Sequence, residues 1–178
     1  WMATMYGGRL RFTTAMLFSI GLVAMFTIGG LSGVTHAVAP ADTQQTDTYY
    51  IIAHFHYVLF GGALLGLFSG MYFWYPKMFG HMLNERLGKW HFWLMMIGFN
   101  ATFGPMHMLG LQGMMRRTYT YTDGQGFNVW NLVATIGAFI LAVSILVFMY
   151  NVAYSYRKHK ANPVDPGPDP WDARSLEW

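Results

Sequence analysis

The segment Asp47-Thr-Tyr-Tyr-Ile-Ile-Ala-His54-Phe55-His56-Tyr57 opens an uncharged run that continues to Tyr75 and is long enough to cross a membrane. An ionisable or metal-binding side chain inside such a run is expected to serve a function. On a helix, positions i and i+2 point about 200° apart. His54 and His56 therefore cannot bind one metal ion together if this run is helical, and each is expected to face a different group.

The composition is typical of a membrane protein. Of the 178 residues, 54% are hydrophobic and 11% are charged, compared with roughly 25% charged residues in soluble domains. The charged side chains lie outside four long uncharged runs, at about residues 12–33, 48–75, 90–111 and 130–156. We therefore predict an all-α fold, a polytopic transmembrane helix bundle with four spans.

Cysteine and charge exclude several functions. The chain has no cysteine, which excludes disulfides, thiolate zinc sites, iron–sulfur clusters and covalently attached c-type haem. The net charge of +3 is spread over loop ends, which indicates membrane topology and not a nucleic-acid surface. Because the chain begins with Trp1 and not with Met, we expect a piece of a longer polypeptide.

The segments that connect or end the spans are predicted to be irregular. Residues 35–47 hold Pro40 and Asp42 and are expected to form a loop, with His36 in it solvated or interfacial. Pro76 is expected to end the second span. The basic, then Pro-rich residues 157–178 are expected to form an irregular tail.

Small residues recur on the first two spans and predict close helix packing. They are Gly29, Gly30, Gly33, Gly62, Gly66 and Gly70.

Lys and Arg side chains predict the orientation in the membrane. If the spans alternate, nine basic residues share one side of the membrane and only Arg116 and Arg117 lie on the other. The nine are Arg9, Arg11, Lys77, Arg86, Lys89, Arg157, Lys158, Lys160 and Arg174. The positive-inside rule then places both ends in the cytoplasm and the start of the second span on the outer side.

Membrane histidines can bind haem iron, ligate copper or zinc, or relay protons. The spacing of His54 and His56 favours two redox centres on opposite sides of one helix, with Phe55 pointing to a third sector. Haem propionates need cationic partners, and Arg116 and Arg117 can pair with carboxylates. A proton or ion relay, or histidines that are merely hydrogen-bonded, remain alternatives. For the remaining histidines of the spans, His91 and His107, structural hydrogen bonding is expected.

The Asp47–Val58 segment resembles the haem-ligand helix of haem–copper oxidase subunit I. The resemblance extends to His91-Phe-Trp-Leu-Met, Gly98-Phe-Asn, Pro105-Met-His107-Met-Leu-Gly-Leu, Gly113-Met-Met-Arg-Arg117 and Asp169-Pro-Trp-Asp-Ala-Arg-Ser-Leu-Glu-Trp178. It covers essentially the whole chain and implies the last four of about twelve helices.

The resemblance implies roles for individual residues. His54 matches the proximal ligand of the high-spin haem at the oxygen site, and His56 matches an axial ligand of the low-spin haem. Phe55 matches the residue between the two haems, and Arg116 and Arg117 match the pair that binds their propionates.

The cofactors implied are two haems of the A type and copper, whose ligands lie on earlier helices outside this chain. Asp47 matches a residue near the outward magnesium site. The preceding position is usually a magnesium-ligand histidine, and here it is Thr46, so the resemblance leaves magnesium binding open.

The activity implied is reduction of O₂ to water with coupled proton translocation, in a bacterial cytoplasmic membrane. It requires the remaining helices of subunit I and the partner subunits II (carrying a dicopper centre) and III. Cytochrome c is the expected donor, because the Asp47-Thr-Tyr-Tyr version resembles that branch. The alternatives are a quinol oxidase of the same superfamily, a di-haem membrane cytochrome without oxygen chemistry, and a histidine-bearing proton or metal transporter.

Overall fold

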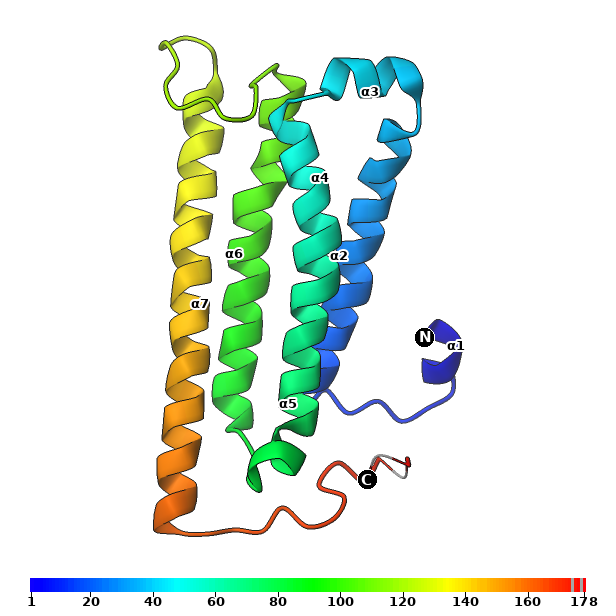
Figure 1. The fold of residues 1–178 in the computed structure, drawn as a ribbon, viewed down its shortest axis with the longest axis vertical. Helices are drawn as coiled ribbons and strands as arrows, with labels where there is room; N and C mark the ends of the chain where they lie inside the picture. Colours follow the sequence, from blue (N-terminus) through cyan, green and yellow to red (C-terminus); the bar gives the residue numbers. More distant parts are fainter. Residues whose placement is uncertain (174, 177) are drawn as a thin grey trace.

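The computed structural model describes residues 1–173, 175, 176 and 178, and the regular structure in this part of the chain is helical (Figure 1). The first four helices are α1 (Met2–Met5), α2 (Thr14–His36), α3 (Ala39–Gln45) and α4 (Tyr49–Leu59). A π-helical turn, η1 (Phe60–Leu64), continues α4 directly into α5 (Leu65–Phe79). The last two helices are α6 (Glu85–Leu111) and α7 (Phe127–Ala161).

The long helices stand side by side in a bundle, with α6 between α7 and the continuous rod of α4 and α5, and with α2 beyond that rod (Figure 1). In the part of the chain that the structure describes, three helices are long and apolar enough to cross a membrane, namely Thr14–His36, Tyr49–Phe79 and Phe127–Ala161. The expected span at residues 90–111 lies in α6, whose first turns carry Glu85, Arg86 and Lys89. The predicted all-α membrane bundle is thus confirmed, whereas the count of four spans stays a prediction.

Polar side chains cap α2, α4 and α6 where they begin, whereas α7 begins after Gly126 without a side-chain cap. Thr13 Oγ1 accepts from the amide of Met16 at the start of α2, and Thr48 Oγ1 accepts from the amide of Tyr50 at the start of α4. Asn84 caps α6 in the same way. Such caps satisfy amides that have no partner within the helix, so they set where each span starts.

The prediction of a loop at residues 35–47 was wrong for most of its length. His36 is the last residue of α2, and α3 occupies Ala39–Gln45. Pro40 lies in the first turn of α3, where the missing amide proton costs nothing. Asp42 lies in the same turn, near the positive end of the helix dipole. The residues that suggested a loop therefore serve as a helix start.

Two predicted helix ends were also wrong. Pro76 lies inside α5, which continues to Phe79 and ends at Gly80 in the left-handed conformation, with φ of 69°. Helix α7 includes residues 157–161, which were expected to belong to an irregular tail. Cationic side chains in a last turn interact favourably with the negative end of the helix dipole, which explains the extension.

An aromatic core joins the lower halves of α2, α5, α6 and α7. Phe18, Phe68, Tyr72, Phe92 and Phe99 are each at most 5% exposed. The rings of Phe68, Tyr72 and Phe92 lie at centroid distances between 5.2 and 5.8 Å from that of Phe18, the range of attractive aromatic pairs. The ring of Phe99 extends this core to Tyr57 of α4, at a centroid distance of 4.7 Å.

Glycines allow the close approach that their spacing predicted, with exceptions. A Cβ on Gly62 or Gly66 would lie 3.0 Å from Phe26 or 2.9 Å from Leu22, so both face α2. Gly70 instead lies against Trp74 of its own helix, and Gly30 has nothing within 4 Å. Gly62 of η1 and Gly66 of α5 therefore form a close contact with α2.

The tail returns to the same end of the bundle as the N-terminal lead. Trp171 Nε1 donates to the carbonyl of Phe73 at 2.8 Å, and its ring stacks on that of Phe73. Arg11 pairs with Asp172 at 3.3 Å. Both ends of the chain thus lie at one end of the bundle (Figure 1). Arg174 and Glu177, named above in the charge count and the C-terminal motif, lie outside the described residues.

Candidate functional site

His54 projects from α4 towards α2. Its Nδ1 lies 3.0 Å from the carbonyl oxygen of Gly29 and 2.9 Å from Ser32 Oγ. A carbonyl only accepts hydrogen bonds, so Nδ1 carries the proton and Nε2 keeps its lone pair. A Cβ on Gly33 would lie 3.0 Å from His54 Cε1, so the absence of a side chain at Gly33 makes room for the ring.

His56 projects from the same helix towards α6. Its Nδ1 lies 2.7 Å from the carbonyl oxygen of Ile52, which sets the same tautomer as in His54. Its ring stacks on Phe103 of α6, with the centroids 4.0 Å apart and an angle of 14° between the planes. The prediction that the two histidines face different neighbours is confirmed, because His54 contacts α2 and His56 contacts α6.

Phe55 lies between them in the sequence and points away from the packed interior. Its side chain is 36% exposed, and its ring contacts that of His56 at a centroid distance of 4.5 Å. It therefore occupies a sector of its own, as its position in the helix predicts.

Arg116 and Asp47 are joined at the opposite end of the bundle from the termini. Their side chains form an ion pair, and the amide of Arg116 donates to the carbonyl of Asp47 at 2.8 Å. Tyr49 and Met114 add a further backbone bond of 2.9 Å. The loop after α6 is thus tied to the start of α4, which places Arg116 near the end of the helix that carries His54 and His56.

Arg117 and Asp47 adopt backbone conformations that few residues other than glycine adopt. Their φ angles are 67° and 60°. Such strain costs about 1 kcal/mol or more and persists only where surrounding contacts impose it. The backbone bonds between residues 47–49 and 114–116 supply those contacts. Arg117 itself is exposed.

The donor set fits axial binding of haem iron. Metal-ligating histidines usually donate one ring N–H to a carbonyl or carboxylate and bind the metal through the other nitrogen. His54 and His56 both meet this condition, and in the described residues no hydrogen bond engages Nε2 of either one. Within those residues no group of three or more His, Cys, Asp or Glu could hold a metal ion. The arrangement therefore suits two single axial ligands and not a shared metal centre.

The magnesium prediction gains no support from the geometry. The Asp47 carboxylate is paired with Arg116, and the Thr46 hydroxyl donates to the carbonyl of Asp42 at 2.8 Å. Neither group is arranged with other oxygen ligands as magnesium requires.

Several residues of the site were missed by sequence reasoning. The carbonyl of Gly29 and the hydroxyl of Ser32 hold His54, and Phe103 packs on His56. The recurrence of small residues in the first span indicated close packing there, but not the partner. His36 was expected to be solvated or interfacial, yet its side chain is 16% exposed and its ring lies 4.8 Å from that of His54.

The other histidines have structural contacts. His91 is fully buried, and its Nδ1 lies 3.1 Å from Tyr72 Oη. His107 Nδ1 lies 3.3 Å from the carbonyl of Gly104, and its ring contacts Tyr50 and Tyr57. Both agree with the structural hydrogen bonding that was expected for them.

Helices of membrane-spanning length and two imidazoles that contact different neighbouring helices characterise a helical membrane protein with two separate histidine sites. Comparison with known proteins is consistent with this class. The family described as Cytochrome C and Quinol oxidase polypeptide I matches residues 1–140. The chain belongs to this family.

Individual relatives match over the whole chain. Cytochrome c oxidase subunit 1 of Thermostichus vulcanus is 54% identical, and that of Alkalihalophilus pseudofirmus is 51% identical, each over 178 residues and 100% of this chain. Quinol oxidase subunit 1 of Bacillus spizizenii is 49% identical over 179 residues and 100% of this chain. The match covers 31%, 28% and 27% of these relatives respectively, so the chain spans less than a third of their length.

A solved structure of a heme-copper terminal oxidase dimer has a TM-score of 0.70 against this chain. The match covers 80% of this chain and 26% of the oxidase chain, with 20% sequence identity. The similarity shows that the two share a fold.

Proposed function

We propose that this chain is the C-terminal part of the catalytic subunit of a respiratory terminal oxidase, where it supplies one axial ligand to each of two haems. One observation carries the proposal. His54 and His56 each donate Nδ1–H to a backbone carbonyl, which leaves Nε2 available on opposite sides of one helix. When bound, the haems, of A type in this proposal, supply electron transfer and, together with copper held by other helices, reduction of O₂ to water.

The residues of this chain would position the two centres. His54 would ligate the high-spin haem on the α2 side, with Gly29 and Ser32 holding its ring. His56 would ligate the low-spin haem on the α6 side, where Phe103 fixes its plane. Phe55, one residue from each ligand, would lie between the haems. A rigid helix would thereby hold both ligands at a constant separation.

Arg116 and Arg117 would serve the haem propionates. Both lie in the loop that is tied to the start of α4, and guanidinium groups pair well with carboxylates. Cations beside the propionates favour the more negative, reduced haem and so raise its potential. Asp47 would hold Arg116 in place, which is a positioning role and not a magnesium site.

The proposed orientation places both ends of the chain in the cytoplasm. The contact between Arg11 and Asp172 brings the two ends together, and most basic residues belong to segments at that end. The positive-inside rule favours this side as the cytoplasmic one. The rest of subunit I and the other oxidase subunits would complete the enzyme.

Replacement of each histidine by leucine in the full oxidase tests the proposal. His54→Leu should remove the high-spin ferric signal and CO binding while the low-spin spectrum persists. His56→Leu should remove the low-spin bands while the high-spin ferric signal and CO binding persist. Absence of any haem spectrum in the wild-type enzyme, or low-spin loss alone in His54→Leu, would overturn the assignment.

Cytochrome c is the donor we propose, and a quinol is the second candidate because relatives of both names match this chain at 46 to 54% identity. Oxygen consumption by the purified enzyme, measured with each reduced donor in turn, distinguishes them. Turnover with a quinol but not with cytochrome c would reject cytochrome c as the donor.

A further inference from the structure

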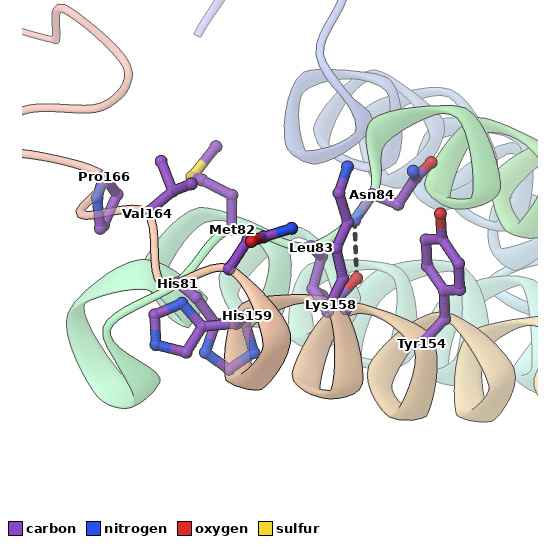
Figure 2. A pocket seen from close by; sticks show the side chains of 11 residues that line it. His81, Met82, Leu83, Asn84, Tyr154, Lys158, His159, Val164 and Pro166 are labelled. Carbon is purple, nitrogen blue, oxygen red and sulfur yellow. Dashed lines mark hydrogen bonds between the residues drawn. The ribbon is translucent and has the colours of Figure 1, made fainter.

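A cavity of about 260 Å³ lies at the end of the bundle that holds both termini, at the opposite end from the start of α4. Its walls are the connection between α5 and α6, the last turns of α7 and the first part of the tail (Figure 2). Met82, Leu83, Val164 and Pro166 make much of its surface apolar. The cavity therefore combines an apolar wall with the polar groups described next.

The ionisable side chains that line this cavity are basic or aromatic, and the basic ones are His81, Lys158 and His159. The acidic groups nearest in sequence are engaged elsewhere. Glu85 accepts from the amide and hydroxyl of Thr14 at 2.9 Å, and Asp165 accepts from the amide of Gly167 at 2.9 Å. Lys158 makes the cavity complementary to an anion that also carries an apolar part.

His81 supplies a second and independent indication of a ligand. It is 5% exposed, and its Nδ1 lies 3.0 Å from the carbonyl of Phe79, so Nδ1 donates. Its Nε2 is buried and has no hydrogen-bond partner in the described residues. The half-buried ring of His159 stacks on it at 4.7 Å (Figure 2). A buried acceptor without a donor is costly, and a ligand hydroxyl that reached it past His159 would satisfy it.

The cavity lies at the level of the lipid headgroups. Helix α7 has 35 residues, about 52 Å at 1.5 Å per residue, against about 30 Å for the hydrocarbon core. Tyr150, Tyr154 and Tyr156 precede the last turn and are 58%, 38% and 57% exposed. Exposed tyrosines of a membrane helix gather at the interface with water, and Tyr154 lines the cavity itself.

We propose that this cavity binds the headgroup of an anionic phospholipid whose headgroup also carries hydroxyl groups. Lys158 binds the phosphate, the side chain of His81 accepts from a headgroup hydroxyl, and the apolar wall contacts the start of the acyl chains. Basic pockets between membrane helices are the usual place where such headgroups bind. The site depends on the membrane location of the chain and not on its haems.

Hydrogen exchange of the full oxidase in lipid nanodiscs tests the proposal. Phosphatidylcholine discs are compared with discs that contain phosphatidylglycerol, and the readout is the exchange rate of residues 79–84 and 154–162. We expect phosphatidylglycerol to slow exchange there by about fivefold, the effect of one lysine at an anionic surface. Lys158→Gln should abolish this protection. Lys158 is exposed, so the variant should fold.

Lys160→Gln is the matched control, because Lys160 is an equally charged, exposed residue of the same helix that does not line the cavity. It should keep the protection. Equal loss in both variants would reduce the effect to general surface charge and overturn the proposal. Lack of protection by phosphatidylglycerol would also overturn it. So would equal protection by inorganic phosphate in phosphatidylcholine discs, because the site would then bind free phosphate.

Discussion

The surroundings of His54 and of His91 show two ways in which this bundle buries an imidazole. His54 is held at one edge by Gly29 and Ser32, while its Nε2 edge carries no hydrogen bond among the described residues. His91 is enclosed by rings on every side, from Phe18, Phe68 and Phe148, and bonds to the hydroxyl of Tyr72.

The difference separates an imidazole that can ligate from one that cannot. A carbonyl at Nδ1 fixes the tautomer of His54 and leaves the lone pair on its other nitrogen. At His91 the aromatic core surrounds the ring completely, and the side chain is fully buried. An engaged Nδ1 alone therefore does not identify a ligating histidine, because Nδ1 of His91 and of His107 is also engaged. In both of these the Nε2 atom is buried and has no partner among the described residues, whereas Nε2 of neither His54 nor His56 is buried in this way.

The largest effect is expected when the ligand itself is removed. His54→Gly in the full oxidase should abolish CO binding, and added imidazole should restore it by entering the space that the ring leaves. His91→Gly should retain CO binding without imidazole. Optical spectra of the CO-bound reduced enzyme provide the measurement. A lack of rescue at His54, with the low-spin bands intact, would contradict axial ligation by this residue.

Truncation of His91 should affect stability and not haem binding. His91→Ala removes a fully buried ring and leaves the Tyr72 hydroxyl without its partner, which should destabilise the protein by about 3 kcal/mol. Thermal loss of haem absorbance in the purified oxidase measures this. His91→Phe is the control that keeps a ring in the same space, and this variant should lose less stability than His91→Ala. Disappearance of one haem signal at low temperature would instead make His91 a ligand.

A smaller effect is expected where α4 and α6 approach each other beside the site. A Cβ on Gly110 would lie 2.5 Å from the Cβ of Tyr50, so Gly110→Ala should push the helices apart and destabilise by about 2 kcal/mol. Gly30→Ala is the matched control, because nothing lies within 4 Å of that position. The thermal midpoints of the two variants provide the comparison. Equal midpoints would show that the close approach is not required.

The smallest effect is expected from the ion pair of Asp47 and Arg116. Both side chains are partly exposed, at 50% and 36%, so Asp47→Asn should cost at most about 1 kcal/mol. Asparagine tolerates the left-handed backbone of this position. Asp47→Leu removes the charge and adds backbone strain, and its thermal midpoint should therefore be lower. If the thermal midpoints of both variants fell by the same amount, the left-handed backbone at Asp47 would make no separate contribution to stability.

The sequence predicted the helical bundle and the divergence of His54 and His56 because both follow from local rules. Uncharged length determines a span, and the angle between positions i and i+2 is a property of any helix. Asp47 and Arg116 were predicted to share the outer side on charge grounds, but their ion pair was not predicted.

What could not be predicted depends on contacts between segments distant in the sequence. The carbonyl of Gly29 fixes the tautomer of His54 from another helix, and Phe103 meets His56 across the bundle. Helix α3 was missed because Pro40 and Asp42 occur in loops and in first turns alike. Local composition does not distinguish the two.

The π-helical turn at Phe60–Leu64 has a consequence for how the rod tolerates changes in length. Each residue of an α-helix rotates the chain by about 100°, so a turn that accommodates one extra residue rotates everything after it. The half above the turn directs His54 and His56 to its two neighbours, and the half below directs Phe68 and Tyr72 into the aromatic core. Deletion of one residue from the turn would leave both halves helical but turned against each other. The rod therefore consists of two helical halves, and the π-helical turn between them determines how far one half is rotated relative to the other.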